Sequence, residues 1–171
     1  MIETQRLILR KFEKSDLEGM FLLHSNPEVH VFLGNQTIST KDEAASLIQY
    51  IQKQYEEHGV ARWACIEKSS RKFMGWCGLK FVTEIENNQS HFHDIGYRFL
   101  PEFWNQGFAK EAAKPCVEYG FHELNLSKII GTCHINNIAS KKVLEHCGLK
   151  EMGLFTWEDR KSTRLNSSHV S

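Results

Sequence analysis

One stretch of the chain, residues 95–109, constrains the fold more than any other, because it has the pattern of a strand, a tight turn and a helix start. Ile95, Tyr97 and Phe99 are β-formers, and Pro101 ends the strand. The residues after the turn are strong helix formers. A helix start leaves about four backbone N–H groups unpaired and carries partial positive charge. The stretch therefore predicts an anion-binding site, for which phosphate is the usual ligand.

The composition of the chain excludes several classes of function. Lys plus Arg and Asp plus Glu number 21 each, so no global field favours nucleic acid or an anionic membrane. No apolar run approaches the roughly 18 residues of a membrane span, and we expect no secretory signal. The five cysteines are widely spaced and form no Cys-x-x-Cys pair, which favours reduced thiols in a cytoplasmic protein. A length of 171 residues favours a single domain.

The chain before this stretch has the pattern of a strand, two helices and an antiparallel sheet. Residues 6–12 alternate as a strand. Capping boxes at Ser15–Glu18 and Thr40–Glu43 each predict the start of a helix, and Gly59 is placed to stop the second. Three further strands follow, over residues 61–67, 73–82 and 91–100. Their short connections imply an antiparallel meander.

The chain after the turn has the pattern of two helices that flank a strand. The first helix is expected over about residues 109–124, with a bend at Pro115, which removes a backbone hydrogen bond. A strand over 128–134 follows. Asn137 then caps a second helix, and Gly148 supplies the left-handed residue that stops it.

The C-terminal end of the chain divides into two parts. Residues 153–159 have the pattern of one more strand. From Lys161 onward the sequence is polar and without periodicity. We therefore predict one domain over residues 2–160, followed over 161–171 by a tail that is disordered or derived from cloning.

Six short motifs occur in order along the chain: Thr4–Arg10, Ser25–Val29, Gly75–Leu79, Ile95–Tyr97, Trp104–Ala109 and Asn137–Ser140. Their order and spacing resemble the GNAT superfamily of N-acetyltransferases, and in particular its RimJ/RimL-type branch, which acetylates protein N-terminal amines. The resemblance covers about residues 2–160. It implies an α+β fold with three α/β/α layers, whose mixed, mostly antiparallel sheet is splayed between the strands at 91–100 and 128–134 to admit acetyl-CoA.

The resemblance implies that the ligand of the anion site at the turn is the pyrophosphate of acetyl-CoA. The family's loop has the form Gln/Arg-x-x-Gly-x-Gly/Ala; Trp104 stands in its first position here, while Gly107 and Ala109 match. Many relatives carry glycine where this chain has Asn105, and asparagine tolerates left-handed backbone angles. The residues expected to bind the donor are Tyr97, Phe99, Trp104, Asn105, Gln106, Gly107, Phe108, Ala109, Asn137 and Ser140.

Acetyl transfer from a thioester to an amine needs a base, an oxyanion donor and a proton for the departing thiolate. The resemblance makes Asp94 the first candidate for the base, through a water; the alternative is a solvated aspartate at a strand end. Asp159 is the second candidate, because RimL-type enzymes carry a glutamate at this distance after Ser140; the alternative is a surface hairpin charge. The oxyanion donor is expected among the backbone N–H groups of residues 96–99.

The proton donor implied by the resemblance is Ser140. Many GNAT enzymes use a tyrosine at the position of Leu144, and the RimL-type pattern uses the serine instead. The alternative is a first-turn helix serine that only hydrogen-bonds the backbone. Asn137 is expected to contact the pantetheine arm, although a capping role alone would also explain it.

These observations predict direct transfer of an acetyl group from acetyl-CoA to a primary amine, without an acyl-enzyme. A protein N-terminal α-amino group is the leading acceptor. The alternatives are a small-molecule amine, such as a polyamine, amino sugar, aminoglycoside or amino acid, and an acyl-CoA-binding module without turnover. His91 and His93 share a strand face but lack a convergent set of further ligands, and the family uses no metal.

Relatives of this kind usually end in a further apolar strand, which the sequence after residue 160 does not resemble. Its absence would leave a sheet edge open. We therefore expect either a shortened protein or an edge that a partner chain fills, as in a homodimer.

Overall fold

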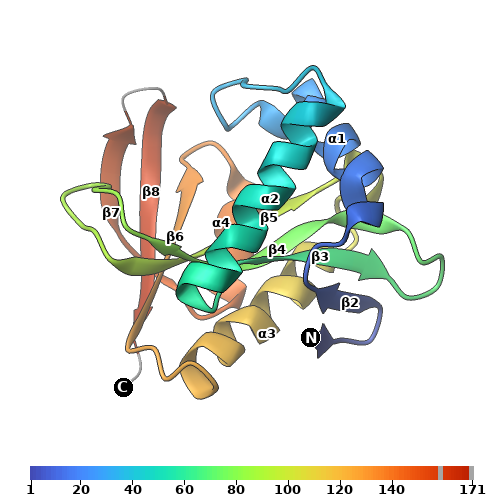
Figure 1. Ribbon diagram of the computed structural model, residues 1–171. Helices are drawn as coiled ribbons and strands as arrows, with labels where there is room; N and C mark the ends of the chain where they lie inside the picture. The colour runs from blue at the N-terminus through green and yellow to red at the C-terminus, as the bar shows by residue number, and fades with distance from the viewer. Residues whose placement is uncertain (158–159, 170–171) are drawn as a thin grey trace.

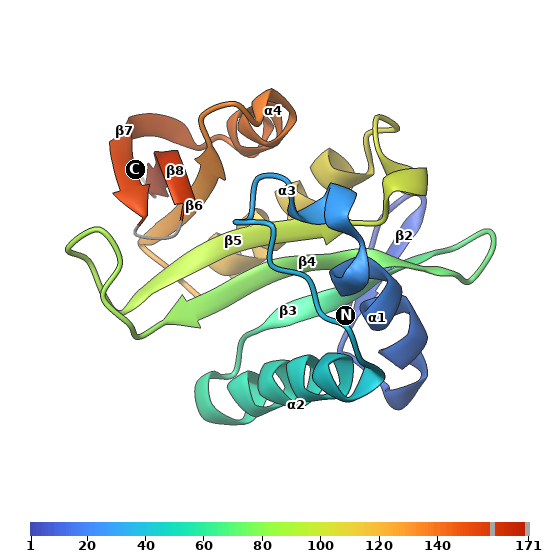
Figure 2. The same cartoon turned by 90° about the horizontal axis from the view of Figure 1, so that it is seen from above.

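Helices cover both faces of one central sheet, so the protein has three layers (Figure 1). The computed structural model describes residues 1–157 and 160–169. Two helices from the N-terminal half lie on one face, and two from the C-terminal half lie on the other (Figure 2). They are α1 (Leu17–Ser25), α2 (Lys41–His58), α3 (Phe108–His122) and α4 (Ile138–His146). The predicted α+β class is confirmed.

The sheet is mixed and mostly antiparallel, as predicted. Its strands are β1 (Ile2–Glu3), β2 (Leu7–Arg10), β3 (Arg62–Glu67), β4 (Phe73–Val82), β5 (Phe92–Phe99), β6 (Lys128–His134), β7 (Lys150–Trp157) and β8 (Arg160–His169). They lie in the order β1-β2-β3-β4-β5-β6-β8-β7. Only β5 and β6 pair in parallel among these described strands.

The parallel pair β5–β6 is short, and the two strands diverge beyond it (Figure 2). The pairing joins His93 to Ile129 and Asp94 to Ile130. From there β5 continues beside β4 and β6 continues beside β8. Since backbone groups of a strand point alternately to its two sides, residues 95–99 present N–H and C=O groups to the opening. The predicted splay of the sheet is confirmed.

The first helix begins differently from the prediction. The capping box is formed by Glu13 and Asp16, and a 3-10 turn, η1 (Lys14–Asp16), leads into α1. Arg10 explains the shift, because its guanidinium donates to both carboxylate oxygens of Asp16, at 2.8 and 2.9 Å. The expected box starting at Ser15 is therefore wrong. Arg10 of β2 holds the Asp16 carboxylate, and Asp16 forms the box with Glu13.

The second helix begins and ends as predicted. The N–H of Glu43 donates to Thr40 Oγ1 at 3.2 Å, and the N–H of Thr40 donates back to Glu43 Oε2 at 2.9 Å. Gly59 ends α2 with a left-handed φ of 70°. On the other face, α3 runs continuously through Pro115.

Two apolar cores hold the helices against the sheet. The larger lies on the side of α3 and α4 and includes Leu79, Ile95, Cys116, Ile129 and Leu144. The smaller lies on the side of α1 and α2 and includes Met20, Ile48, Ile51, Ala64 and Ile66. Burial of each large apolar side chain stabilises the fold by roughly 1.5–3 kcal/mol. Both helix layers are thereby fixed relative to the opening between β5 and β6.

The chain does not lack a final strand, so that expectation is wrong. β8 lies between β6 and β7, and its register with β6 runs from Lys128 opposite His169 to His134 opposite Thr163. Backbone groups make this pairing, so the strand forms without an apolar alternation in its sequence. Residues 161–169 thus join the sheet. The predicted domain boundary after residue 160 and the cloning-derived origin of the segment stay predictions.

Candidate functional site

The loop between β5 and α3 has the backbone of an anion cradle. Asn105 and Gly107 both have left-handed angles, with φ of 58° and 80°. The expectation that Asn105 tolerates this conformation is confirmed. A Cβ added at Gly107 would meet only the Nη2 atom of Arg6, at 3.6 Å, so the space beside this residue is otherwise open. α3 begins at the next residue, and glycine has no side chain with which to cap its N–H groups.

The predicted donor-binding side chains of this loop are engaged with neighbouring backbone. Trp104 Nε1 donates to the carbonyl of Phe99 at 2.8 Å, and Gln106 Nε2 donates to the carbonyl of Glu102 at 2.8 Å. The side chains of Phe99 and Phe108 are buried in the larger core. The backbone N–H groups of the loop are therefore the groups best placed to bind an anion.

Tyr97 on β5 and Ser140 on α4 meet across the opening between β5 and β6. Tyr97 Oη lies 2.8 Å from Ser140 Oγ and donates to the Ser140 carbonyl at 3.0 Å. Burial raises the pKa of Tyr97, an effect that the hydrogen bond to Ser140 opposes but does not cancel. The phenol is therefore neutral at pH 7. Both residues were predicted for the site, but their contact was not.

The capping role predicted for Asn137 is confirmed. Its Oδ1 accepts the N–H of Ser140 at 3.1 Å. This bond fixes the first turn of α4 and with it the position of the Ser140 hydroxyl. Contact between Asn137 and a pantetheine arm stays a prediction.

Asp94 is half-buried and ion-paired rather than solvated. Its carboxylate contacts Arg62 Nη2, and its carbonyl accepts from Arg62 Nη1 at 2.7 Å. A Cβ at Gly96 would lie 2.6 Å from the Arg62 guanidinium, so this pair requires a glycine at residue 96. Alternation along β5 places Asp94 on the opposite face of the strand from Tyr97. The Asp94–Arg62 pair and the Tyr97–Ser140 contact therefore lie on opposite faces of the sheet.

The second predicted base, Asp159, lies outside the described residues.

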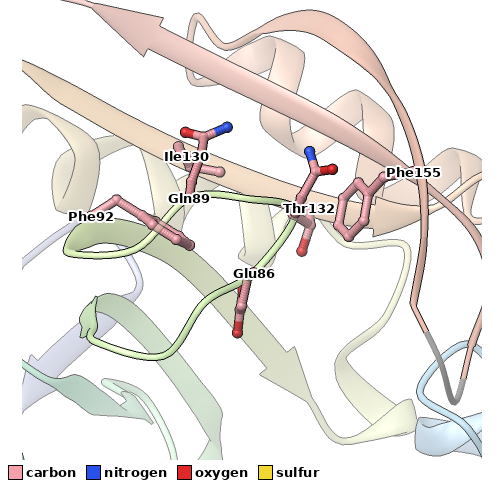
Figure 3. Close-up of a pocket in the computed structure, with 7 residues that line it drawn as sticks. Glu86, Gln89, Phe92, Ile130, Thr132 and Phe155 are labelled. Carbon is pink, nitrogen blue, oxygen red and sulfur yellow. The ribbon is translucent and has the colours of Figure 1, made fainter.

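The face of the sheet that carries Asp94 also carries a shallow pocket (Figure 3). It encloses about 210 Å³ of space, including open solvent. The β5–β6 pairing forms one wall, because Ile130, the partner of Asp94, belongs to the lining. The lining residues are Glu86, Asn87, Gln89, Phe92, Ile130, Thr132 and Phe155. Neither the pocket nor its residues were predicted, since they come from four separate segments.

A cluster of nitrogen-bearing side chains lies further along the same face. Trp76 Nε1 donates to His24 Nε2 at 3.3 Å, and Arg98 Nη1 lies 3.2 Å from His24 Nδ1 and 3.4 Å from His30 Nε2. Burial, followed by the charge of Arg98, lowers the pKa of His24 to about 3, so this ring is neutral. The cluster was not predicted; the alternation that places Asp94 and Arg98 on one strand face was the available signal in the sequence.

None of the five cysteines, all of them in the described part of the chain, forms a disulfide. Burial raises the pKa of Cys65 and Cys77, and raises that of Cys147 to about 12, which disfavours the nucleophilic thiolate at these three residues. Across residues 1–157 and 160–169, no group of three or more His, Cys, Asp or Glu is placed to hold a metal ion. No helix in these ranges combines the length and apolarity needed to cross a membrane.

Comparisons with known proteins bear on this site. A family model described as an acetyltransferase (GNAT) domain matches residues 6–150. The uncharacterized N-acetyltransferase YoaA of Bacillus subtilis is 32% identical over 154 residues, which are 90% of this chain and 85% of that protein.

Solved structures share the fold. An acetyltransferase (GNAT family) from Bacillus anthracis has a TM-score of 0.80 at 24% identity and covers 98% of this chain and 97% of its own. A spermidine N-acetyltransferase from Vibrio cholerae, in complex with CoA and spermine, gives 0.77 at 21%, covering 97% and 96%. A putative ribosomal-protein-serine acetyltransferase from Vibrio cholerae gives 0.76 at 20%, covering 99% and 97%.

Proposed function

The chain belongs to the GNAT acetyltransferase family, and from this premise we propose that it acetylates primary amines with acetyl-CoA as donor, a protein N-terminal α-amino group being the leading acceptor. The observation that carries the proposal is the left-handed turn at Asn105 and Gly107, which opens α3 beside the divergence of β5 from β6. This places an anion cradle next to an unpaired strand edge.

The donor fits this arrangement in both of its parts. The backbone N–H groups from Asn105 to Ala109 would hold the pyrophosphate, because the space beside Gly107 is open. The exposed edge of β5 over residues 95–99 would pair with the amide groups of the pantetheine arm. Bound in this way, acetyl-CoA supplies the thioester carbonyl that the amine attacks.

Ser140 is the proposed acid for the departing thiolate, with Tyr97 as its partner. When the Tyr97 O–H donates to Ser140 Oγ in place of the Ser140 carbonyl, the serine proton is left to point into the opening. This proton passes to the sulfur as the carbon–sulfur bond breaks, and a proton from solvent restores the serine hydroxyl. A backbone N–H of residues 96–99 would stabilise the oxyanion of the tetrahedral intermediate.

Asp94 is the proposed base, acting through a water on the acceptor side. Its carboxylate is ion-paired with Arg62 on the face of β5 away from Tyr97. An α-amino acceptor, whose pKa lies near 8, needs less help from a base at pH 7 than a lysine-type amine, whose pKa lies near 10.4. The protein N-terminal amine is preferred for this reason.

A small-molecule amine is the second candidate. The solved complex of a spermidine N-acetyltransferase with CoA and spermine is the observation that favours it. The pocket on the same face as Asp94 has aromatic walls at Phe92 and Phe155, which would suit the aliphatic segments of such a molecule.

Release of CoA thiol in the presence of a panel of amines tests the proposal. The panel contains peptides with free N-termini, the same peptides N-terminally blocked, spermidine and an aminoglycoside. We expect release with the free peptides, and none with the blocked ones. Release with spermidine alone moves the acceptor to the second candidate. Thermal stabilisation by acetyl-CoA without release for any amine identifies a binding module without turnover.

A further inference from the structure

Arg6 reaches the donor loop from the segment before β2. Its Nη1 donates to the carbonyl of Gln106, 100 residues later in the chain, at 3.0 Å. Its Nε donates to Glu111 Oε2 at 2.7 Å, and its guanidinium lies over the ring of Phe108, 4.0 Å from the centroid. One side chain therefore contacts the loop, the first residue of α3 and the first turn of that helix.

The carboxylate of Glu111 makes this contact rigid. Its Oε1 accepts from Thr4 Oγ1 at 2.6 Å and from the N–H of Arg6 at 2.8 Å, while Oε2 takes the Arg6 side chain. Burial raises the pKa of Glu111, but the hydrogen bonds from Thr4 and Arg6 outweigh burial and lower it overall. The group is ionised at pH 7, and both of its oxygens are engaged.

Arg6 determines the direction in which one N–H group of the cradle points. The peptide unit is planar and trans, so the carbonyl of Gln106 and the N–H of Gly107 point in opposite directions. Because Arg6 holds that carbonyl on its own side, the N–H of Gly107 faces the other way. Rotation of this peptide unit would present a carbonyl oxygen to an incoming phosphate in place of a donor.

Arg6 also balances a charge. Glu111 lies in the first turn of α3, where a carboxylate benefits from the helix dipole but would repel a pyrophosphate bound at the same helix end. The ion pair at 2.7 Å neutralises that carboxylate. The same guanidinium thus orients a donor and removes a repulsion.

We propose that Arg6 is a positioning residue for the pyrophosphate of the donor, acting through the Gln106–Gly107 peptide and through Glu111. The inference rests on the proposed use of acetyl-CoA. It assigns a function to the N-terminal Thr4–Arg10 motif, which lies at the start of the chain and contains no residue of the reaction itself.

Two conservative variants test this role. Arg6→Lys keeps the positive charge but loses the planar fork that serves Gln106 and Glu111 together. Glu111→Gln keeps the shape of the side chain and removes its charge. Arg10→Lys is the matched control, because Arg10 also makes a two-pronged ion pair, with Asp16, and its guanidinium hydrogen bonds go to Asp16 and to the Lys11 carbonyl. Each variant is compared with the unaltered protein for folding by circular dichroism, for acetyl-CoA affinity by calorimetry and for kinetics with two donors.

The two donors are acetyl-CoA and S-acetylpantetheine, which lacks the pyrophosphate. We expect Arg6→Lys to weaken acetyl-CoA binding and raise its KM about tenfold, the size of one lost hydrogen bond to a charged group. Turnover at saturating acetyl-CoA, and kcat/KM with S-acetylpantetheine, should stay within about twofold of the unaltered protein. Glu111→Gln should shift the same quantities in the same direction, and Arg10→Lys should shift none of them.

Equal loss with both donors, unchanged acetyl-CoA affinity in both variants, or an equal effect of Arg10→Lys would overturn the role of Arg6. If Arg6→Lys does not fold, the acetyl-CoA affinity and kinetics of Glu111→Gln alone test the role of Arg6. If the unaltered protein does not bind acetyl-CoA, the proposed function falls and this inference falls with it. If the unaltered protein binds and the variants bind equally well, only this inference falls.

Discussion

The carboxylate of Asp94 is ion-paired with Arg62 on the face of β5 opposite to the contact between Tyr97 and Ser140. The strand thus separates the two polar groups, one on each face of the sheet. If the protein acts as proposed, the acceptor amine arrives on the side of Asp94 and the thiolate departs on the side of Ser140.

Replacement of Asp94 by asparagine should lower turnover at pH 7 at least about tenfold, because the variant has no carboxylate to accept a proton. Affinity for acetyl-CoA, measured by calorimetry, should not change. Asp16→Asn is the control, since it breaks a comparable pair with Arg10 away from the opening and should cost stability without lowering turnover. Normal turnover in Asp94→Asn together with a loss in Asp159→Asn would move the base to Asp159.

Gly107→Glu should abolish measurable acetyl-CoA binding, because it places a side chain and a negative charge where the pyrophosphate is expected. Gly107→Ala should also lose stability, by about 1–2 kcal/mol, owing to its φ of 80°. Gly59→Ala is matched to it, with a φ of 70° and no atom within 4 Å of an added Cβ. That variant should lose similar stability in a urea titration and keep full donor affinity. Unchanged affinity in Gly107→Glu would remove the loop from the donor site.

Ser140→Ala should lower turnover about tenfold or more, because the proton donor for the departing thiolate is lost. Tyr97→Phe should cause a smaller loss. The double variant should cost less than the two single losses combined, since the two hydroxyls act as one unit at 2.8 Å. Ser46→Ala removes a helix serine whose hydroxyl donates to the Asp42 carbonyl, and should leave turnover unchanged. Additive losses from Ser140 and Tyr97 would show that they act separately.

The buried ring of His24 should make the fold sensitive to acid. Its pKa is lowered to about 3 in the folded protein, first by burial and then by Arg98 and His30, so the unfolded chain binds the proton more readily. Stability should therefore fall as the pH drops below about 6.5 and continue to fall towards about 3, by roughly a few kcal/mol in total. His24→Asn should flatten this dependence in urea titrations at several pH values. The exposed His146, replaced by Gln, should have little effect; an equal slope in His24→Asn would contradict the assignment.

The sequence predicted best those features that depend on residues close together in the chain. The capping box at Thr40–Glu43, the left-handed stop at Gly59, the cap at Asn137 and the turn at Gly107 each arise from a backbone preference or from a hydrogen bond spanning a few residues. Such preferences act before tertiary contacts form, so a sequence pattern records them directly.

The capping box predicted at Ser15 failed because Asp16 bonds Arg10 on a neighbouring strand. The prediction that a final strand is missing was wrong for a related reason. β8 is held by backbone pairing with β6 and β7, and such pairing leaves little trace in the pattern of side chains. In both cases a neighbouring element outweighed the local pattern.

By itself, the sequence determined the order of the elements from β2 to β7 and the strand–turn–helix that forms the anion cradle. Only the tertiary structure decided which residues of the site contact one another: Asp94 with Arg62, Tyr97 with Ser140, and Arg6 with Gln106 and Glu111. The physical reason is the sequence distance over which each interaction acts. A backbone preference is fixed within a few residues, whereas the partner of a charged or hydroxyl side chain depends on which strands and helices become neighbours.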